Sequence, residues 1–96
     1  PLREYKGENK NFEDVESSMF IRLSVKDEPG VLAKIAGTFG ENNVSIESVI
    51  QEGRGDKAEL VLVTHEAPEK DLNNSINQIS SLDAVTTVTS LLRVYV

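Results

Sequence analysis

Residues 23–46 read LSVKDEPGVLAKIAGTFGENNVSI and contain a strand end, a turn and a complete helix. Apolar residues occupy every second position from Met19 up to the turn, which is typical of a half-buried strand. The Asp27–Gly30 segment stops that strand; its acidic residues can cap a helix, and Pro29 suits the first helical position. Apolar residues with helical spacing follow as far as Phe39. The stretch therefore predicts a strand, a tight turn and an amphipathic helix.

The rest of the chain continues this alternation of strands and helices. A change of phase near Ser48 predicts a bulge in the second strand, and Gly53–Asp56 predict a hairpin turn. The last strand is rich in Val and Thr, and its alternation is unclear around Ser90–Leu92. The expected strands are Met19–Lys26, Val44–Glu52, Lys57–His65 and Ala84–Tyr95, and the expected helices are Pro29–Asn42 and Glu69–Leu82.

This β-α-β-β-α-β order predicts an α+β fold of the ferredoxin-like type. Each strand–helix–strand crossover is expected to be right-handed, which places both helices on one face of the sheet. The sheet is expected to be antiparallel and four-stranded, with the strands in the order 4-1-3-2 when they are numbered along the chain. The opposite face has no helix to cover it, so a partner subunit is expected there or at the edges.

The length of 96 residues allows one small domain. Residues 1–17 are polar with few apolar side chains, and we expect them to form a linker or extension before a domain that spans residues 18–96. The first residue is Pro1 rather than Met, which suggests a piece of a longer chain. The sequence alone does not distinguish a fragment from a stand-alone protein.

Composition argues against several functional classes. A net charge of −6 disfavours binding to nucleic acid, and the absence of cysteine excludes disulfides and thiolate metal sites. A single histidine, His65, is not enough for a histidine-rich metal site, and no nucleophile–base pair can be assembled. No apolar run approaches the roughly 18 residues of a membrane span. We therefore expect a soluble cytoplasmic domain with no catalytic residues, no metal and no cofactor of its own.

The turn and the start of the second strand carry the candidate binding residues. Gly30 allows a ligand to approach the backbone, and the N–H groups around Gly30 and Val31 suit a carboxylate at the positive end of a helix. Asp27 can accept a hydrogen bond from an ammonium group. Asn43 and Ser45 offer further polar groups. A free amino acid presents one carboxylate and one ammonium group, so it matches this arrangement.

Each of these residues also has a purely structural interpretation. Asp27 can be a helix cap, Gly30 can relieve a tight turn, Asn43 can end the helix and Ser45 can be a solvated strand residue. The residues alone leave both interpretations open.

The junction between the first strand and the first helix, together with the start of the second strand, resembles the signature of the ACT family. In that signature a strand is followed by Asp-x-Pro-Gly-Val-Leu, an amphipathic helix and then Asn/Gly-x-Ser/Asn-Ile, here Asn43–Ile46. The resemblance covers residues Met19–Val96. More narrowly, FIRLSVKDEPGVLAKIAGTFGENNVSIESVIQ and AELVLVTHEA resemble the C-terminal regulatory region of bacterial homoserine dehydrogenases. That family implies a preceding NAD(P)-dependent catalytic part and threonine as the feedback effector. No Gly-x-Gly-x-x-Gly follows a strand here, so the chain itself has no recognisable nicotinamide site.

The resemblance and the turn together predict an amino acid, threonine first, bound between two subunits. The expected ligand-binding residues are Asp27, Gly30 and Val31 of one subunit with Asn43, Ser45 and Ile46 of its neighbour in a two-fold homodimer. The expected dimer interface involves the first helix and the second strand, near Phe39–Ile46. The alternative is a ligand-free dimerisation domain of an amino-acid metabolic enzyme.

Other uses of the same topology fit less well. RNA-recognition modules need aromatic residues on the central strands, and the third strand, AELVLVTH, has none. Metal-carrying domains need a Cys-x-x-Cys loop, and acylphosphatase-type enzymes need an arginine in the turn that Asp27–Gly30 occupies.

Overall fold

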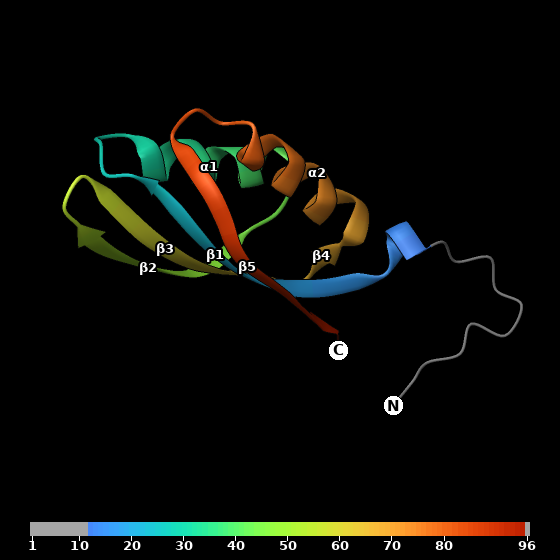
Figure 1. Ribbon diagram of the computed structural model, residues 1–96. Coiled ribbons are helices and arrows are strands. Elements are labelled where there is room, and N and C mark those ends of the chain that lie inside the picture. The colour runs from blue at the N-terminus through green and yellow to red at the C-terminus, as the bar shows by residue number, and fades with distance from the viewer. Residues whose placement is uncertain (1–11, 96) are drawn as a thin grey trace, which may run out of the picture.

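The computed structural model describes residues 12–95 and shows two helices on one face of an antiparallel sheet (Figure 1). A short 3-10 turn, η1 (Phe12–Asp14), comes first. The strands are β1 (Glu16–Lys26), β2 (Ile46–Arg54), β3 (Lys57–Thr64), β4 (Ala67–Pro68) and β5 (Val85–Tyr95), and the helices are α1 (Val31–Glu41) and α2 (Glu69–Ser80). The predicted ferredoxin-like α+β fold is confirmed.

The four long strands lie in the order β5-β1-β3-β2, which is the predicted order 4-1-3-2. Phe20 in β1 pairs with Val63 on one side and with Leu92 on the other. The short strand β4 was not predicted. Ser17 pairs with Ala67 of β4 and, on its other side, with Tyr95 of β5. Strand β4 therefore pairs with the same edge of β1 as β3 does, nearer to the N-terminal end of β1.

Strand β1 begins at Glu16, three residues before the predicted start. The extra residues are held because β4 and β5 both pair with this end of the strand. Ser17, assigned to the linker from its polar surroundings, is fully buried here. Residues 1–11 of the predicted linker lie outside the described residues.

The two irregular places in the sequence pattern are irregular in the sheet. Between Ile46 and Ser48 the register of β2 against β3 shifts, which confirms the predicted bulge. In β5 the register shifts around Thr89, whose hydroxyl donates to the Arg22 carbonyl at 3.1 Å. The hairpin turn is shorter than the predicted Gly53–Asp56, because only Gly55 and Asp56 lie between β2 and β3. Gly55 has a φ of 73°.

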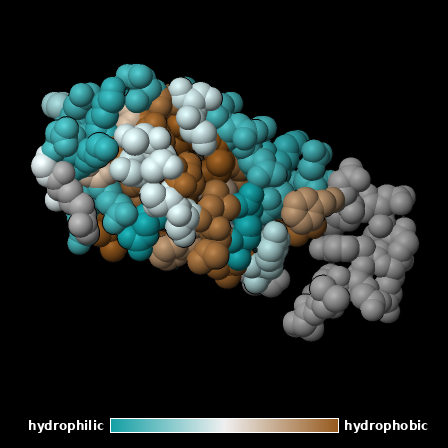
Figure 2. Space-filling model, in the orientation of Figure 1, coloured by the Kyte–Doolittle hydropathy of each residue, from teal (hydrophilic) through white to brown (hydrophobic). Residues whose placement is uncertain are grey.

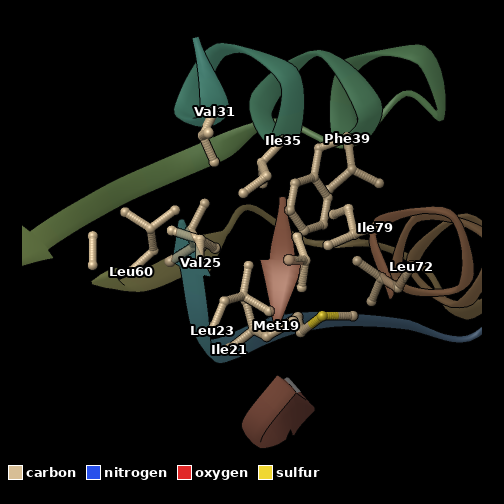
Figure 3. Packing of buried hydrophobic residues seen from close by; sticks show 14 of the residues in the cluster. Met19, Ile21, Leu23, Val25, Val31, Ile35, Phe39, Leu60, Leu72 and Ile79 are labelled. Carbon is tan, nitrogen blue, oxygen red and sulfur yellow. The ribbon is translucent and has the colours of Figure 1, made fainter. Parts of the chain in front are cut away.

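The core lies between the sheet and the helices (Figure 3). Alternate residues of β1 and β3 are buried, and they meet side chains three or four residues apart on the helices. The fully buried large residues include Met19, Ile21, Leu23, Ile35, Phe39, Leu60, Leu62, Leu72 and Ile79. Burial of one such side chain stabilises the fold by about 1.5–3 kcal/mol. This packing fixes α1 over the sheet and so fixes the turn that precedes it.

No helix within residues 12–95 covers the opposite face of the sheet (Figure 1). Val61 and Val63 of the central strand β3 are half-buried there, and Phe20 beside them is exposed. A partner subunit is expected from the sequence on this face or at the sheet edges, and among residues 12–95 only the other face is covered by helices.

Candidate functional site

The β1–α1 junction is a tight turn with glycine at its critical position. Gly30 has φ 86° and ψ −8°, and the Val31 N–H donates to the Glu28 carbonyl at 3.4 Å, as in a type II turn with Pro29 before the glycine. The left-handed region favours glycine because other residues meet their own carbonyl there. The sequence placed Pro29 in the first helical turn, whereas the helix begins two residues later.

The N-terminus of α1 has no side-chain cap. Gly30 occupies the capping position, and no side chain accepts a hydrogen bond from the first turn. The capping role considered for Asp27 and Glu28 is therefore wrong, because the turn separates these residues from the helix. The Lys34 N–H donates to the Gly30 carbonyl at 3.0 Å.

The N–H groups of Leu32 and Ala33 find no acceptor among residues 12–95. These donors lie at the positive end of the helix dipole. They are suited to hold a carboxylate.

A pocket of about 410 Å³ opens at this helix start. Its walls come from the end of β1, the turn, the first turn of α1 and the neighbouring parts of β2 and β3. The lining residues are Val25, Lys26, Asp27, Glu28, Pro29, Gly30, Val31, Leu32, Ala33, Gln51 and Leu60. A Cβ on Gly30 would meet nothing within 4 Å, so the space beside this glycine is open. The pocket can admit a small molecule directly against the backbone.

Asp27 lies at the rim of the pocket, where the β2–β3 hairpin meets the turn. Its N–H donates to the Asp56 carbonyl at 3.1 Å, and its Oδ2 lies 3.3 Å from the position of a Cβ on Gly53. The residue is exposed. Asp27 lines the pocket, and its carboxylate is able to accept a hydrogen bond.

Gln51 is a pocket residue that the sequence interpretation missed. The bulge between Ile46 and Ser48 shifts the phase of β2, so Gln51 and not Ile50 lies on the helix side, opposite buried Leu60. The break in alternation was visible in the sequence, but the residue at which the phase changes was not. A carboxamide on this wall can both donate and accept hydrogen bonds.

The other candidate residues lie beyond the opposite end of α1. Asn43 has a φ of 63°, and its N–H donates to the Gly40 carbonyl while the Val44 N–H donates to the Phe39 carbonyl. This Schellman arrangement ends the helix, which confirms the left-handed geometry expected of the asparagine.

Ser45 is exposed, and its carbonyl accepts a hydrogen bond from the His65 N–H at 2.9 Å. Ile46, the first residue of β2, is half-buried.

The two halves of the candidate site do not meet in one chain. Asp27, Gly30 and Val31 line the pocket, while Asn43 and Ser45 do not. The 11 residues of α1 separate the two groups, a length of about 16 Å at 1.5 Å per residue. A site that uses both groups therefore requires two chains.

The described residues show few other groups that could carry chemistry. Among residues 12–95 no three His, Cys, Asp or Glu side chains gather as metal ligands would. None of the helices in that range has the length and apolarity needed to cross a membrane.

Comparison with known proteins identifies relatives of the whole domain. A family model described as the ACT domain matches residues 19–84. The homoserine dehydrogenase of Neisseria gonorrhoeae is 40% identical over 83 residues, covering 84% of this chain and 19% of the relative. The chain thus spans about one fifth of the length of that protein.

Solved structures give the same result for the fold. A homoserine dehydrogenase from Thiobacillus denitrificans superposes with a TM-score of 0.74 at 30% identity, over 90% of this chain and 19% of that one. The ACT domain of a GTP pyrophosphokinase from Chlorobium tepidum superposes with a TM-score of 0.60 over 84% of this chain and 99% of that domain. At 15% identity the second likeness concerns the fold alone.

Proposed function

The chain belongs to the ACT domain family, and from that premise we propose that it senses a free amino acid as the regulatory domain of a homoserine dehydrogenase. The chain corresponds to about one fifth of such relatives, 19% of one of them. In this proposal the remaining length of the parent carries the dehydrogenase chemistry and its nicotinamide cofactor. The domain itself has no catalytic residue and binds no cofactor. A cytoplasmic location of the parent remains a prediction.

The observation that carries the proposal is the uncapped start of α1, which opens onto a pocket. The unpartnered N–H groups of Leu32 and Ala33 would hold the ligand carboxylate, and Gly30 would let it approach. The Asp27 carboxylate at the rim would accept from the ammonium group. These groups recognise the part that all free amino acids share.

We propose threonine as the ligand, a choice that the family resemblance supports. Its side chain carries one hydroxyl and one methyl group. Gln51 lies on the pocket wall and can hydrogen-bond the hydroxyl, while Val25 and Leu60 offer apolar surface to the methyl. A pocket with both kinds of group favours a small polar side chain over a purely apolar one.

A two-fold homodimer would complete the site. The start of β2 from a partner, with Asn43, Ser45 and Ile46, would close the pocket over the turn of the first chain. Two features support this interface: the outer edge of β2 pairs with no other strand among residues 12–95, and Val49 on this strand is 40% exposed. Unpaired strand edges and apolar residues of this kind favour association.

A thermal-shift screen of the twenty amino acids against the chain tests the function. A ligand that binds only the native state stabilises it by about 2.7 kcal/mol at one hundred times its Kd. For a domain of this size that corresponds to a shift of several degrees. Threonine should give the largest shift. If no amino acid changes the melting temperature, a ligand-free dimerisation domain becomes the better interpretation.

A further inference from the structure

The end of β3 connects the start of β2, which is one half of the proposed ligand site, to the start of β1. Ile46 of β2 pairs with Thr64 of β3, and the Ser45 carbonyl accepts a hydrogen bond from the His65 N–H at 2.9 Å. On its other side, Thr64 accepts a hydrogen bond through its hydroxyl from the Met19 N–H, also at 2.9 Å. One residue of β3 therefore contacts both β2 and β1 here.

The pairing of β1 is irregular at the same place. Phe20 pairs with Val63 of β3, and Ser17 pairs with Ala67 of β4. Three residues of the β3–β4 segment therefore lie opposite two residues of β1, which is the residue count of a β-bulge. At this bulge the Thr64 hydroxyl takes the place of a backbone acceptor. We call the β1 residues on the far side of the bulge, Glu16–Met19, the entry.

The Thr64 hydrogen bond is shielded from water. Thr64 and Met19 are both fully buried. Ser17, the next buried residue of the entry, donates its hydroxyl to the buried Glu69 carboxylate at 2.9 Å. Loss of a buried acceptor leaves its donor unsatisfied, because water cannot take the acceptor's place. The end of β3 is therefore held firmly against the entry.

A second connection from the same half of the ligand site leads to α2 and is exposed. Asn42 Nδ2, next to Asn43, donates to Gln78 Oε1 at 3.0 Å on the molecular surface. Figure 2 shows hydrophilic residues over the outer side of α2, which lies at the upper right in Figure 1. Water can replace a hydrogen bond on such a surface at little cost. The buried Thr64 bond is therefore the more effective connection.

We propose that the Thr64 hydroxyl couples ligand binding at the start of β2 to the ordering of the entry. The inference rests on the proposed function, in which the ligand contacts Ser45 and Ile46. A ligand that fixes these residues also fixes the end of β3, and the Thr64 hydroxyl then restricts opening of the entry. Any part of a longer parent that precedes the domain joins it through this strand, so the entry is where it would respond to the ligand.

Amide hydrogen exchange of the full chain, with and without threonine, tests the coupling. Threonine is used at about one hundred times its calorimetric Kd, so amides that exchange only through global unfolding should slow about 100-fold. Leu23, in the middle of β1, reports this global effect. Ser17 and Ser18 report local opening of the entry, which should slow about fivefold or more where ligand and entry are coupled.

Thr64→Val removes the hydroxyl and keeps the shape of the side chain. In this variant threonine should still slow exchange at Leu23 but should no longer slow exchange at Ser17 and Ser18. Thr64→Ser retains a hydroxyl and should behave as the wild type does. If Ser17 and Ser18 slow as much in Thr64→Val as in the wild type, the hydroxyl is not the connection.

The reverse effect is measured by calorimetry and does not depend on the folding of Thr64→Val. Coupling is reciprocal, so Ser17→Ala, which loosens the entry, should raise the Kd of threonine about fivefold. Ser75→Ala is the matched control, because Ser75 is also fully buried and its hydroxyl donates to the Asp71 carbonyl within α2. The control should keep the wild-type Kd, and an unchanged Kd in Ser17→Ala would contradict the coupling.

The exchange data separate this inference from the proposed function. If threonine slows Leu23 in the wild type but leaves Ser17 and Ser18 unchanged, the ligand binds and the coupling is wrong. If threonine slows none of these amides, it does not bind, and the proposed function fails together with this inference.

Discussion

Arg93 Nε lies 2.8 Å from Oε2 and 3.0 Å from Oε1 of Glu69, whose side chain is 2% exposed. Ser17 donates its hydroxyl to the same carboxylate at 2.9 Å, and the Glu69 N–H donates to the Val15 carbonyl. The ion pair therefore ties the entry of β1, the first residue of α2 and the end of β5 together. It lies where the chain enters the domain.

Arg93→Met should destabilise the fold strongly. The substitution keeps much of the apolar stem but leaves the Glu69 carboxylate buried without its cation, which typically costs about 3–5 kcal/mol. Urea unfolding measures the loss. Arg22→Met is the matched control, since its partner Glu59 is 25% exposed, and removal of such a surface pair costs about 0–1 kcal/mol. Equal losses in the two variants would contradict the role given to the Arg93–Glu69 pair.

Gly30→Ala and Gly55→Ala should separate backbone strain from ligand access. Both glycines have positive φ, and at both a Cβ meets nothing within 4 Å. Each substitution therefore costs about 1–2 kcal/mol of stability for the left-handed backbone. Because only Gly30 lines the pocket, only Gly30→Ala should reduce the thermal shift caused by threonine. Equal thermal shifts of the two variants with threonine would contradict a binding site at this turn.

Gln51→Leu should change ligand preference. Valine has nearly the shape of threonine but lacks the hydroxyl that Gln51 is proposed to hydrogen-bond. Loss of that bond should weaken the binding of threonine by about 0.5–1.5 kcal/mol and leave the binding of valine almost unaffected. Calorimetric titration gives a Kd for each amino acid, and the ratio of the two Kd values measures the preference for threonine over valine. Ile50→Gln, at the adjacent position on the other face of β2, should leave the ratio as it is in the wild type.

The Lys26–Asp83 pair should give a small alkaline dependence of stability. A hydrogen bond and the charge of Asp83 at 3.0 Å raise the pKa of Lys26 above 10.5. The folded state therefore holds the proton more tightly, so the contribution is complete below pH 10.5 and is lost as the pH rises through the folded-state pKa. The melting temperature should fall more steeply with pH in the wild type than in Asp83→Asn. Added salt should reduce the difference, because Asp83 is almost fully exposed and Lys26 is 44% exposed.

Local periodicity was sufficient to predict the fold. Ile35 and Phe39 lie four residues apart and identify the buried face of α1, and the alternation from Met19 identifies β1. The residue at which α1 begins was harder to predict, because an acidic pair before Pro-Gly is compatible both with a helix cap and with a turn. Only the observed φ of Gly30 distinguishes the two.

The remaining differences depend on contacts that are distant in the sequence. Glu69 looked like an ordinary residue at the start of a helix, and its burial depends on Arg93, 24 residues later. Gln51 enters the pocket because a bulge shifts the phase of β2. Asp27 and Ser45 were predicted to act together, and the single chain keeps them at opposite ends of α1, so their joint role depends on a second copy.

Binding between two chains can be tested by mixing two inactive variants. Asp27→Lys damages the turn half of every site and Ser45→Trp damages the β2 half, and both residues are exposed, so both variants should fold. Neither homodimer should bind threonine in calorimetry. A mixed dimer has one intact site, made by the turn of one variant and the β2 start of the other.

After equimolar mixing and exchange of subunits, calorimetric titration with threonine is predicted to recover about a quarter of the wild-type binding capacity, because half of the dimers are mixed and each has one of two sites. If the mixture binds no more threonine than the separate variants, the site does not lie between two chains. If either variant alone binds as the wild type does, that residue is not part of the site.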